Sequence, residues 1–145
     1  MRYKDYLKTD HSCPFCNDQE RMLKENEHAF LTYALAPYHK HHLLVIPKVH
    51  MESLFEITSE QRDDIDKLLN TGMSALRNVG YSNLTIIVRE GNESTKSIQH
   101  LHYHIIPNTQ IGDLDHNGNE RTILSETEKE LVIKDIKSAL NKDKY

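Results

Sequence analysis

The segment His100-Leu-His102-Tyr-His104 places three imidazoles at alternate positions of the chain. Residues 98–107 are predicted to form a β-strand, in which alternate side chains share one face. The three imidazoles are therefore expected to point in the same direction. Such a row is costly unless something binds it, because protonated neighbours repel and neutral imidazoles still need hydrogen-bond partners.

Three interpretations of this row compete. The histidines can be a purely structural surface of the strand. They can hold a metal, since His-x-His on a strand is a good zinc chelate. They can also bind and attack a phosphate, because imidazole is a nucleophile that is neutral near pH 7.

The flanking residues resemble the histidine triad (HIT) family of nucleotide hydrolases and transferases. The family signature is His-φ-His-φ-His-φ-φ, in which φ is apolar, and residues 100–106 match it. A second block, His42-Leu-Leu-Val-Ile-Pro-Lys-Val-His50, is similar to an upstream strand of the family, where a fourth histidine precedes an apolar run that ends in proline. The resemblance covers residues 11–107.

The resemblance implies a mechanism and the residues that carry it. In the family the middle histidine attacks the α-phosphorus of a nucleotide, and water then opens the covalent nucleotidyl-imidazole. His102 matches this nucleophile, and His104 and His42 match the histidines beside the phosphate. Ser97 matches a hydroxyl that hydrogen-bonds the phosphate. We further expect a backbone carbonyl to fix the tautomer of His102, because the attacking nitrogen must be unprotonated.

Two residues near the predicted phosphate site depart from the family pattern. Arg89 stands where relatives often have Asn, and its guanidinium is suited to phosphate oxygens. The alternative is an ion pair between Arg89 and Glu90 or Glu93. Lys96 either adds positive charge beside the phosphates or is a solvated loop lysine.

The sequence Cys13-Pro-Phe-Cys16 contains the only two cysteines. A Cys-x-x-Cys pair can be a redox motif, half of a metal site or a coincidence. Branches of the HIT family use such a pair with two histidines to bind structural zinc, which here implies Cys13, Cys16, His50 and His100 as ligands. Two cysteines and two histidines form the closed tetrahedral set of a structural Zn²⁺ site. The alternatives are His11 in place of His50, or no bound metal.

Hydrophobic periodicity predicts an α+β fold. A helix is expected from Thr58 to about Asn78, with a capping box formed by Thr58 and Gln61, and Gly80 is placed to end it. A last helix is expected from Ser125 to about Asn141. The expected strands cover residues 30–36, 42–46, 83–89 and 98–107, and the resemblance implies an antiparallel sheet of about five strands with helices on one face.

The whole chain, residues 1–145, is expected to form one domain, with a HIT-like core at 11–107 and an extension at 108–145. The net charge of -4 argues against broad binding to nucleic acid or to an anionic membrane. The apolar runs are too short to span a bilayer, and the first residues lack an apolar signal core, so a cytoplasmic protein is expected. The resemblance also implies a homodimer.

The leading prediction is an enzyme that acts at the α-phosphate of a small nucleotide. Its substrate would be a dinucleoside polyphosphate, a nucleoside phosphoramidate or an adenylylated metabolite, and a phosphorylase is a close variant. One alternative is a nucleotide-binding sensor or adaptor with little turnover. Another is a metallohydrolase with zinc on all three strand histidines.

Overall fold

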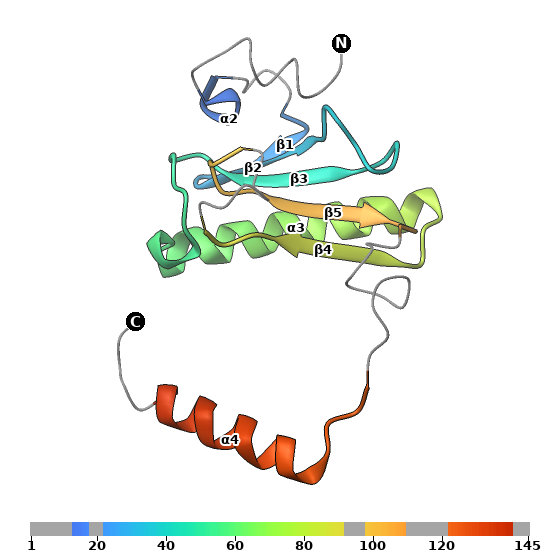
Figure 1. Cartoon of the computed structure of the whole chain (residues 1–145). Coiled ribbons are helices and arrows are strands. Elements are labelled where there is room, and N and C mark those ends of the chain that lie inside the picture. The colour runs from blue at the N-terminus through green and yellow to red at the C-terminus, as the bar shows by residue number, and fades with distance from the viewer. Residues whose placement is uncertain (1–12, 18–21, 92–97, 110–121, 141–145) are drawn as a thin grey trace. The chain divides into compact units, whose positions relative to one another are not determined.

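The computed structural model describes residues 13–17, 22–91, 98–109 and 122–140. Its contacts divide the chain into two compact units, residues 1–109 and residues 110–145. The first unit has a five-stranded sheet with a long helix against one face, so the predicted α+β class is confirmed (Figure 1).

The sheet has the strand order β1-β2-β3-β5-β4, and each neighbouring pair is antiparallel. Its strands are β1 (Lys24–Glu25), β2 (Ala29–Tyr33), β3 (Leu43–Pro47), β4 (Leu84–Val88) and β5 (Tyr103–Pro107). The predicted hairpin is present, but β2 ends three residues before the expected Ala36. Its ladder closes at Ala34, whose N–H donates to His42 O (3.0 Å), and the chain then turns through Pro37, which has no N–H.

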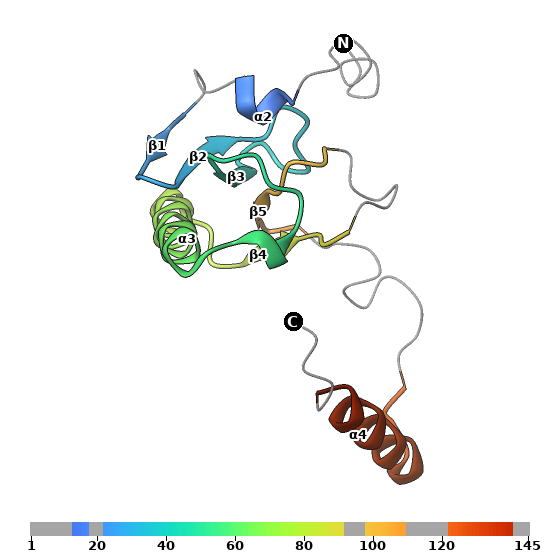
Figure 2. The ribbon, with the colours of Figure 1, turned by 90° about the vertical axis from the view of Figure 1, so that its left-hand side faces the viewer.

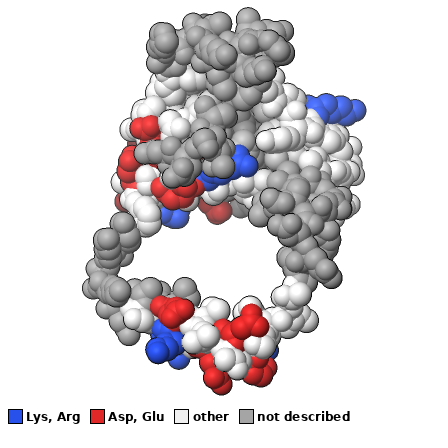
Figure 3. Space-filling model, in the orientation of Figure 1, with Lys and Arg blue, Asp and Glu red and all other residues white. Residues whose placement is uncertain are grey.

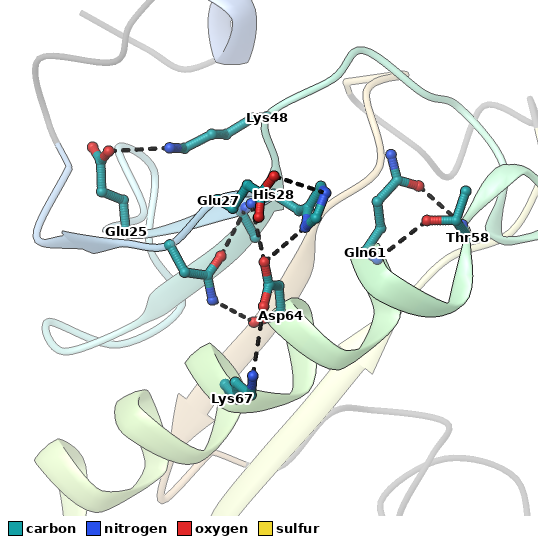
Figure 4. Close-up of polar contacts among 10 residues, drawn as sticks. Glu25, Glu27, His28, Lys48, Thr58, Gln61, Asp64 and Lys67 are labelled. Atoms are coloured by element: carbon teal, nitrogen blue, oxygen red, sulfur yellow. Dashed lines mark hydrogen bonds and ion pairs between the residues drawn. The ribbon is translucent and has the colours of Figure 1, made fainter.

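Helix α3 (Ser59–Val79) follows the predicted helix closely. The Gln61 N–H donates to Thr58 Oγ1 (3.2 Å), and the Thr58 N–H donates to Gln61 Oε1 (2.9 Å), which completes the capping box (Figure 4). Gly80 ends the helix with φ of 123°, a left-handed conformation that favours glycine.

Apolar side chains pack on both faces of the sheet. Helix α3 covers one face, where the buried core consists of Ala29, Leu31, Val45, Ile65, Leu68, Leu76 and Ile105. On the opposite face lie Phe15, Phe30, Leu44, Ile46 and Ile98. Figure 2 shows α3 and the short helix α2 (Pro14–Asn17) on opposite sides of the strands. Helix α2 was not predicted, since four residues carry no periodicity, and Phe15 anchors it by burial.

A polar cluster ties α3 to the turn between β1 and β2. His28 donates its backbone N–H to Asp64 Oδ2 (3.2 Å), and its Nδ1 lies 2.8 Å from the same oxygen. Asn26 adds a bond from Nδ2 to the Asp64 carbonyl oxygen (2.9 Å). The pKa of Asp64 lies below its ordinary value mainly because the carboxylate accepts hydrogen bonds from His28.

The second unit contains helix α4 (Glu126–Leu140), which confirms the predicted C-terminal helix. Its predicted capping box is present, because the Glu128 N–H donates to Ser125 Oγ and the Ser125 N–H donates to Glu128 Oε1, both at 3.2 Å. Acidic and basic side chains are interspersed along it (Figure 3). Within the described ranges, no helix combines the length and the apolar composition needed to cross a membrane.

Candidate functional site

Of the three histidines in segment 100–104, only His104 lies within a strand, which corrects the predicted strand over residues 98–107. Strand β5 begins only at Tyr103, so His100 and His102 precede it. The Leu101 N–H donates to the Met51 carbonyl oxygen (2.7 Å) instead of extending the ladder with β3.

His102 is held in one tautomer by the backbone. Its Nδ1 lies 2.8 Å from the His100 carbonyl oxygen, which only accepts hydrogen bonds, so the proton must be on Nδ1. Nε2 then carries the lone pair that a nucleophile needs. The edge of Phe15 packs against this imidazole with ring centroids 5.0 Å apart. The expected backbone carbonyl is therefore that of His100.

His42 and His104 form a hydrogen-bonded pair beside His102. The His104 and His102 ring centroids are 4.7 Å apart. The Tyr38 N–H donates to His42 Nδ1 (3.2 Å), so a neutral His42 carries its proton on Nε2. His42 Nε2 lies 2.9 Å from His104 Nδ1 and donates to it. These two hydrogen bonds place the proton of a neutral His104 on Nε2, the nitrogen that does not face His42.

Burial keeps this pair neutral. Desolvation is the largest cause that lowers the pKa of His42 to about 4, with smaller contributions from His102 and His39. Desolvation likewise lowers the pKa of His104 to about 3, and the charges of His102, His42 and Arg89 act in the same direction. Near pH 7 His42 and His104 are thus neutral imidazoles with assigned N–H donors.

Cys13, Cys16, His50 and His100 converge as the resemblance implied. One ligand atom from each lies within 4.8 Å of the others, a cluster that could hold a metal ion. Cys13 Sγ is 3.2 Å from His100 Nδ1, and Cys16 Sγ is 3.3 Å from His50 Nδ1. Cys13 directly precedes α2 and Cys16 lies in it, whereas His50 follows β3 and His100 precedes β5. A bound ion would therefore join three parts of the chain.

The protonation of this cluster suits a cation. His100 Nε2 lies 2.8 Å from the Pro47 carbonyl oxygen, which fixes the proton on Nε2 and leaves the Nδ1 lone pair toward the thiols. Desolvation lowers the pKa of His100 to about 4, so this nitrogen stays unprotonated at neutral pH. Burial and the neighbouring Cys13 raise the pKa of Cys16 to about 11, and a bound metal would displace that thiol proton.

The predicted phosphate-binding residues are only partly visible. Arg89 is exposed directly after β4, close enough for its charge to lower the pKa of His104. Glu90, a predicted alternative partner of Arg89, accepts hydrogen bonds from Ser53 Oγ (3.0 Å) and from the Leu54 N–H in the 3-10 helix η2 (Leu54–Glu56). The remaining predicted residues, Ser97, Lys96, Glu93 and His11, lie outside the described residues.

The sequence did not reveal two contacts of the site. Phe15 was noted only as part of the cysteine motif, yet its ring touches both His100 and His102. Tyr38 stacks on His42 with ring centroids 5.8 Å apart, and its N–H fixes the His42 tautomer. Neither Phe15 nor Tyr38 belongs to a spacing pattern that would have predicted its contact.

Comparison with known proteins identifies the family of this chain. The model of the HIT domain matches residues 17–111 of this chain. The chain belongs to the HIT family. An adenosine 5'-monophosphoramidase of Xenopus tropicalis is 32% identical over 114 residues, which cover 72% of this chain and 74% of that protein. An adenosine 5'-monophosphoramidase of Schizosaccharomyces pombe is 34% identical over 73 residues, 50% of this chain and 53% of the relative.

Other HIT proteins extend this likeness. A bifunctional bis(5'-adenosyl)-triphosphatase/adenylylsulfatase of Arabidopsis thaliana is 28% identical over 107 residues, which cover 70% of this chain and 58% of the relative. The chain thus spans between about half and three quarters of these relatives. A solved HIT-family structure from Bacillus subtilis superimposes with a TM-score of 0.73 at 26% identity, and the match covers 93% of this chain and 99% of the other.

Proposed function

We propose that this HIT protein is a nucleotide hydrolase or nucleotidyl transferase that acts at the α-phosphate, with His102 as its nucleophile. The observation that carries the proposal is the bond from His102 Nδ1 to the His100 carbonyl oxygen, which leaves the lone pair on Nε2. Family membership supports hydrolysis of nucleotides, since relatives carry the names of a monophosphoramidase and a triphosphatase.

The proposed reaction has two displacements. His102 Nε2 attacks the α-phosphorus, an N–P bond forms, and the P–O or P–N bond to the leaving group breaks. Water then attacks the same phosphorus, loses its proton, and releases the nucleoside monophosphate and the free imidazole. The leaving group takes up one proton, so atoms and charge balance over the cycle.

Donors around the phosphate should stabilise the charge that develops in each displacement. His104 is proposed to donate from Nε2–H, in the tautomer set by His42. Arg89 is proposed as a further phosphate contact, supported by its electrostatic effect on His104. Ser97 and Lys96 complete the proposed phosphate-binding set on the strength of the family resemblance.

A structural zinc ion is proposed for the cluster of Cys13, Cys16, His50 and His100. The donor set supports Zn²⁺, because two thiolates and two neutral imidazoles close a tetrahedral shell with no position for substrate. The ion would supply no reaction step. It would hold Phe15 and His100, whose ring and carbonyl contact His102.

We also propose that the chain acts as one HIT domain in a cytoplasmic homodimer that takes a small nucleotide, not a nucleic acid or membrane, as its ligand. Strand β4 supports self-association, because it is an edge strand of the sheet and its Ile86 is 43% exposed. Size-exclusion chromatography with light scattering should then give twice the mass of one chain. A monomer at micromolar concentration would contradict this part of the proposal.

The other two interpretations make different predictions. A sensor or adaptor would bind mononucleotides tightly and would keep its biological activity in His102→Ala. A metallohydrolase would need zinc on all three histidines, but His104 Nδ1 accepts from His42 and His100 Nδ1 faces Cys13. These contacts favour the covalent mechanism over a metal shared by the three imidazoles.

Release of nucleoside monophosphate from a panel of substrates tests the proposal. The panel should contain a dinucleoside tetraphosphate, an adenosine phosphoramidate and an adenylylated metabolite. The variant His102→Asn keeps an N–H donor for the His100 carbonyl but has no nucleophile. We expect it to lose about a thousandfold or more in turnover while it still binds nucleotide.

Near-native release by His102→Asn, on every substrate that the wild type hydrolyses, would overturn the nucleophile assignment. Adding inorganic phosphate separates the hydrolase from the phosphorylase. A dinucleoside tetraphosphate then yields the nucleoside diphosphate only if phosphate replaces water as the acceptor.

A further inference from the structure

The rings of His39, His41 and Tyr81 form a cluster that includes no residue of the proposed phosphate site or zinc site. His39 and His41 stand in the turn between β2 and β3, and Tyr81 follows α3. Tyr81 Oη is 2.6 Å from His41 Nδ1. The edge of the His39 ring packs against Tyr81 with centroids 5.1 Å apart and an interplanar angle of 88°. Both histidines therefore contact one tyrosine that is 40 positions away from His41 in the sequence.

Tyr81 itself is firmly placed. Its N–H donates to the Leu76 carbonyl oxygen (3.1 Å), and the Gly80 N–H donates to the Arg77 carbonyl oxygen (3.0 Å). These two bonds form the Schellman motif that ends α3. The ring of Tyr81 also packs against the buried core beneath α3. Its hydroxyl is thus a fixed point to which the turn is attached.

The turn is also tied within itself. The His42 N–H donates to the His39 carbonyl oxygen (2.9 Å), and the His41 N–H donates to His39 Nδ1 (3.0 Å). Its last residue is His42, whose Nδ1 accepts from the Tyr38 N–H at 3.2 Å. A shift of the turn by a few tenths of an ångström would weaken this already long bond.

We propose that Tyr81 is a positioning residue for the phosphate site. Its hydroxyl holds the turn of residues 37–42 so that the Tyr38 N–H faces His42 Nδ1. The bond selects the Nε2–H tautomer of His42, which in turn places the proton of His104 on its Nε2. The inference rests on the proposed function for its catalytic consequence, but the effect on the tautomer is a property of the substrate-free protein.

The variant Tyr81→Phe keeps the ring and removes only the hydroxyl. Two-bond ¹H–¹⁵N spectra of the imidazoles report which nitrogen of His42 carries the proton. In the wild type we expect a single Nε2–H tautomer, and in Tyr81→Phe a shift of both His42 nitrogen signals toward a mixture. We expect kcat to fall about fivefold, equivalent to about 1 kcal/mol, with KM within about twofold and an unchanged melting temperature.

A double-mutant cycle with His41 supplies the matched control. In the His41→Ala background, Tyr81→Phe should have no further effect on the His42 signals or on kcat, because the bond is already lost. His41→Asn, whose side-chain amide can still meet the hydroxyl, should restore the wild-type His42 tautomer. Additive effects of the two substitutions would overturn the proposed link.

Unchanged His42 signals in Tyr81→Phe would also overturn the inference, whether or not turnover falls. A fall in turnover accompanied only by a lower melting temperature would make Tyr81 merely structural. Failure of the proposed function looks different. In that case His102→Asn would retain activity, or no substrate would be turned over, while the His42 signals would still respond to Tyr81→Phe.

Discussion

His42 Nε2 lies 2.9 Å from His104 Nδ1, and the two residues are 62 positions apart in the sequence. The direction of this bond is fixed because the Tyr38 N–H already occupies His42 Nδ1. The proposed role of His42 is therefore to act on the phosphate site through His104 and not by direct attack. In the proposed mechanism such a neutral donor pair would offer a hydrogen bond to a phosphate oxygen without competing with His102 for the reacting phosphorus.

Removal of His42 should impair turnover by releasing His104. In His42→Ala, His104 Nδ1 loses its donor, which costs about 1–3 kcal/mol and lowers kcat by about 10- to 100-fold. His42→Gln, whose amide can donate to the same nitrogen, should recover part of the loss. Equal activity of the alanine and glutamine variants, both shown by circular dichroism to be folded, would contradict this role.

The buried histidines should make the fold sensitive to acid. Their pKa values fall from 6.5 to about 4 for His42 and about 3 for His104, so the folded protein resists protonation more than the unfolded chain does. The stability that they contribute is complete above pH 6.5 and is lost as the pH falls toward those lowered values. Urea unfolding at a series of pH values measures this loss.

His104→Gln provides the comparison for that titration. It removes one of the protonating groups, so its unfolding free energy should depend less steeply on pH, by up to about 1.4 kcal/mol per pH unit at 25 °C. An identical slope in the wild type and the variant between pH 6.5 and pH 4 would show that His104 is not protected from protonation.

Metal content and thermal stability should depend on the cysteine and histidine cluster. Protein purified without a histidine tag should contain about one zinc ion per chain, and Cys13→Ser and His50→Asn should each lose most of it. His41→Asn changes a histidine outside the cluster and should keep the metal. Chelation should lower the melting temperature of the wild type but not that of Cys13→Ser. Zinc retained in both cluster variants would contradict the assignment.

A side chain at Gly72 of helix α3 should crowd the buried core. A Cβ there would lie 2.7 Å from Ile105 Cδ1 and 3.2 Å from Leu31 Cδ1, both in the buried core. Gly72→Val should therefore destabilise the fold by about 1–3 kcal/mol through overpacking. Ala75→Val, on the exposed side of the same helix, should cost about 0.5 kcal/mol or less. Equal losses in denaturant unfolding would show that the helix and sheet are not in such close contact.

Local patterns predicted the long elements of the fold. The capping boxes of α3 and α4 depend on residues three positions apart, so the sequence alone contained them. Strand β1 and helix α2 escaped prediction because two and four residues are too few to show a period. The start of β5 was wrong because the Leu101 N–H bonds to Met51, a contact that alternation within one segment cannot reveal.

The sequence likewise predicted some features of the candidate site and not others. The resemblance grouped His42, His102 and His104, and it grouped the four possible metal ligands, because both sets occur in recognisable blocks. The tautomers could not be assigned from sequence, since they depend on the carbonyls of His100 and Pro47 and on the Tyr38 N–H. The contact between His41 and Tyr81 joins residues that no motif relates.

The proposed mechanism requires a covalent bond between His102 and the nucleotide. To detect this bond, the protein is mixed with excess substrate and quenched without acid. The mass of the peptide that contains His102 is then measured. We predict a nucleoside monophosphate adduct on His102 in the wild type and none in His102→Asn. Turnover in the quenched sample with no adduct on any histidine, or an adduct on His100 or His104, would contradict the mechanism.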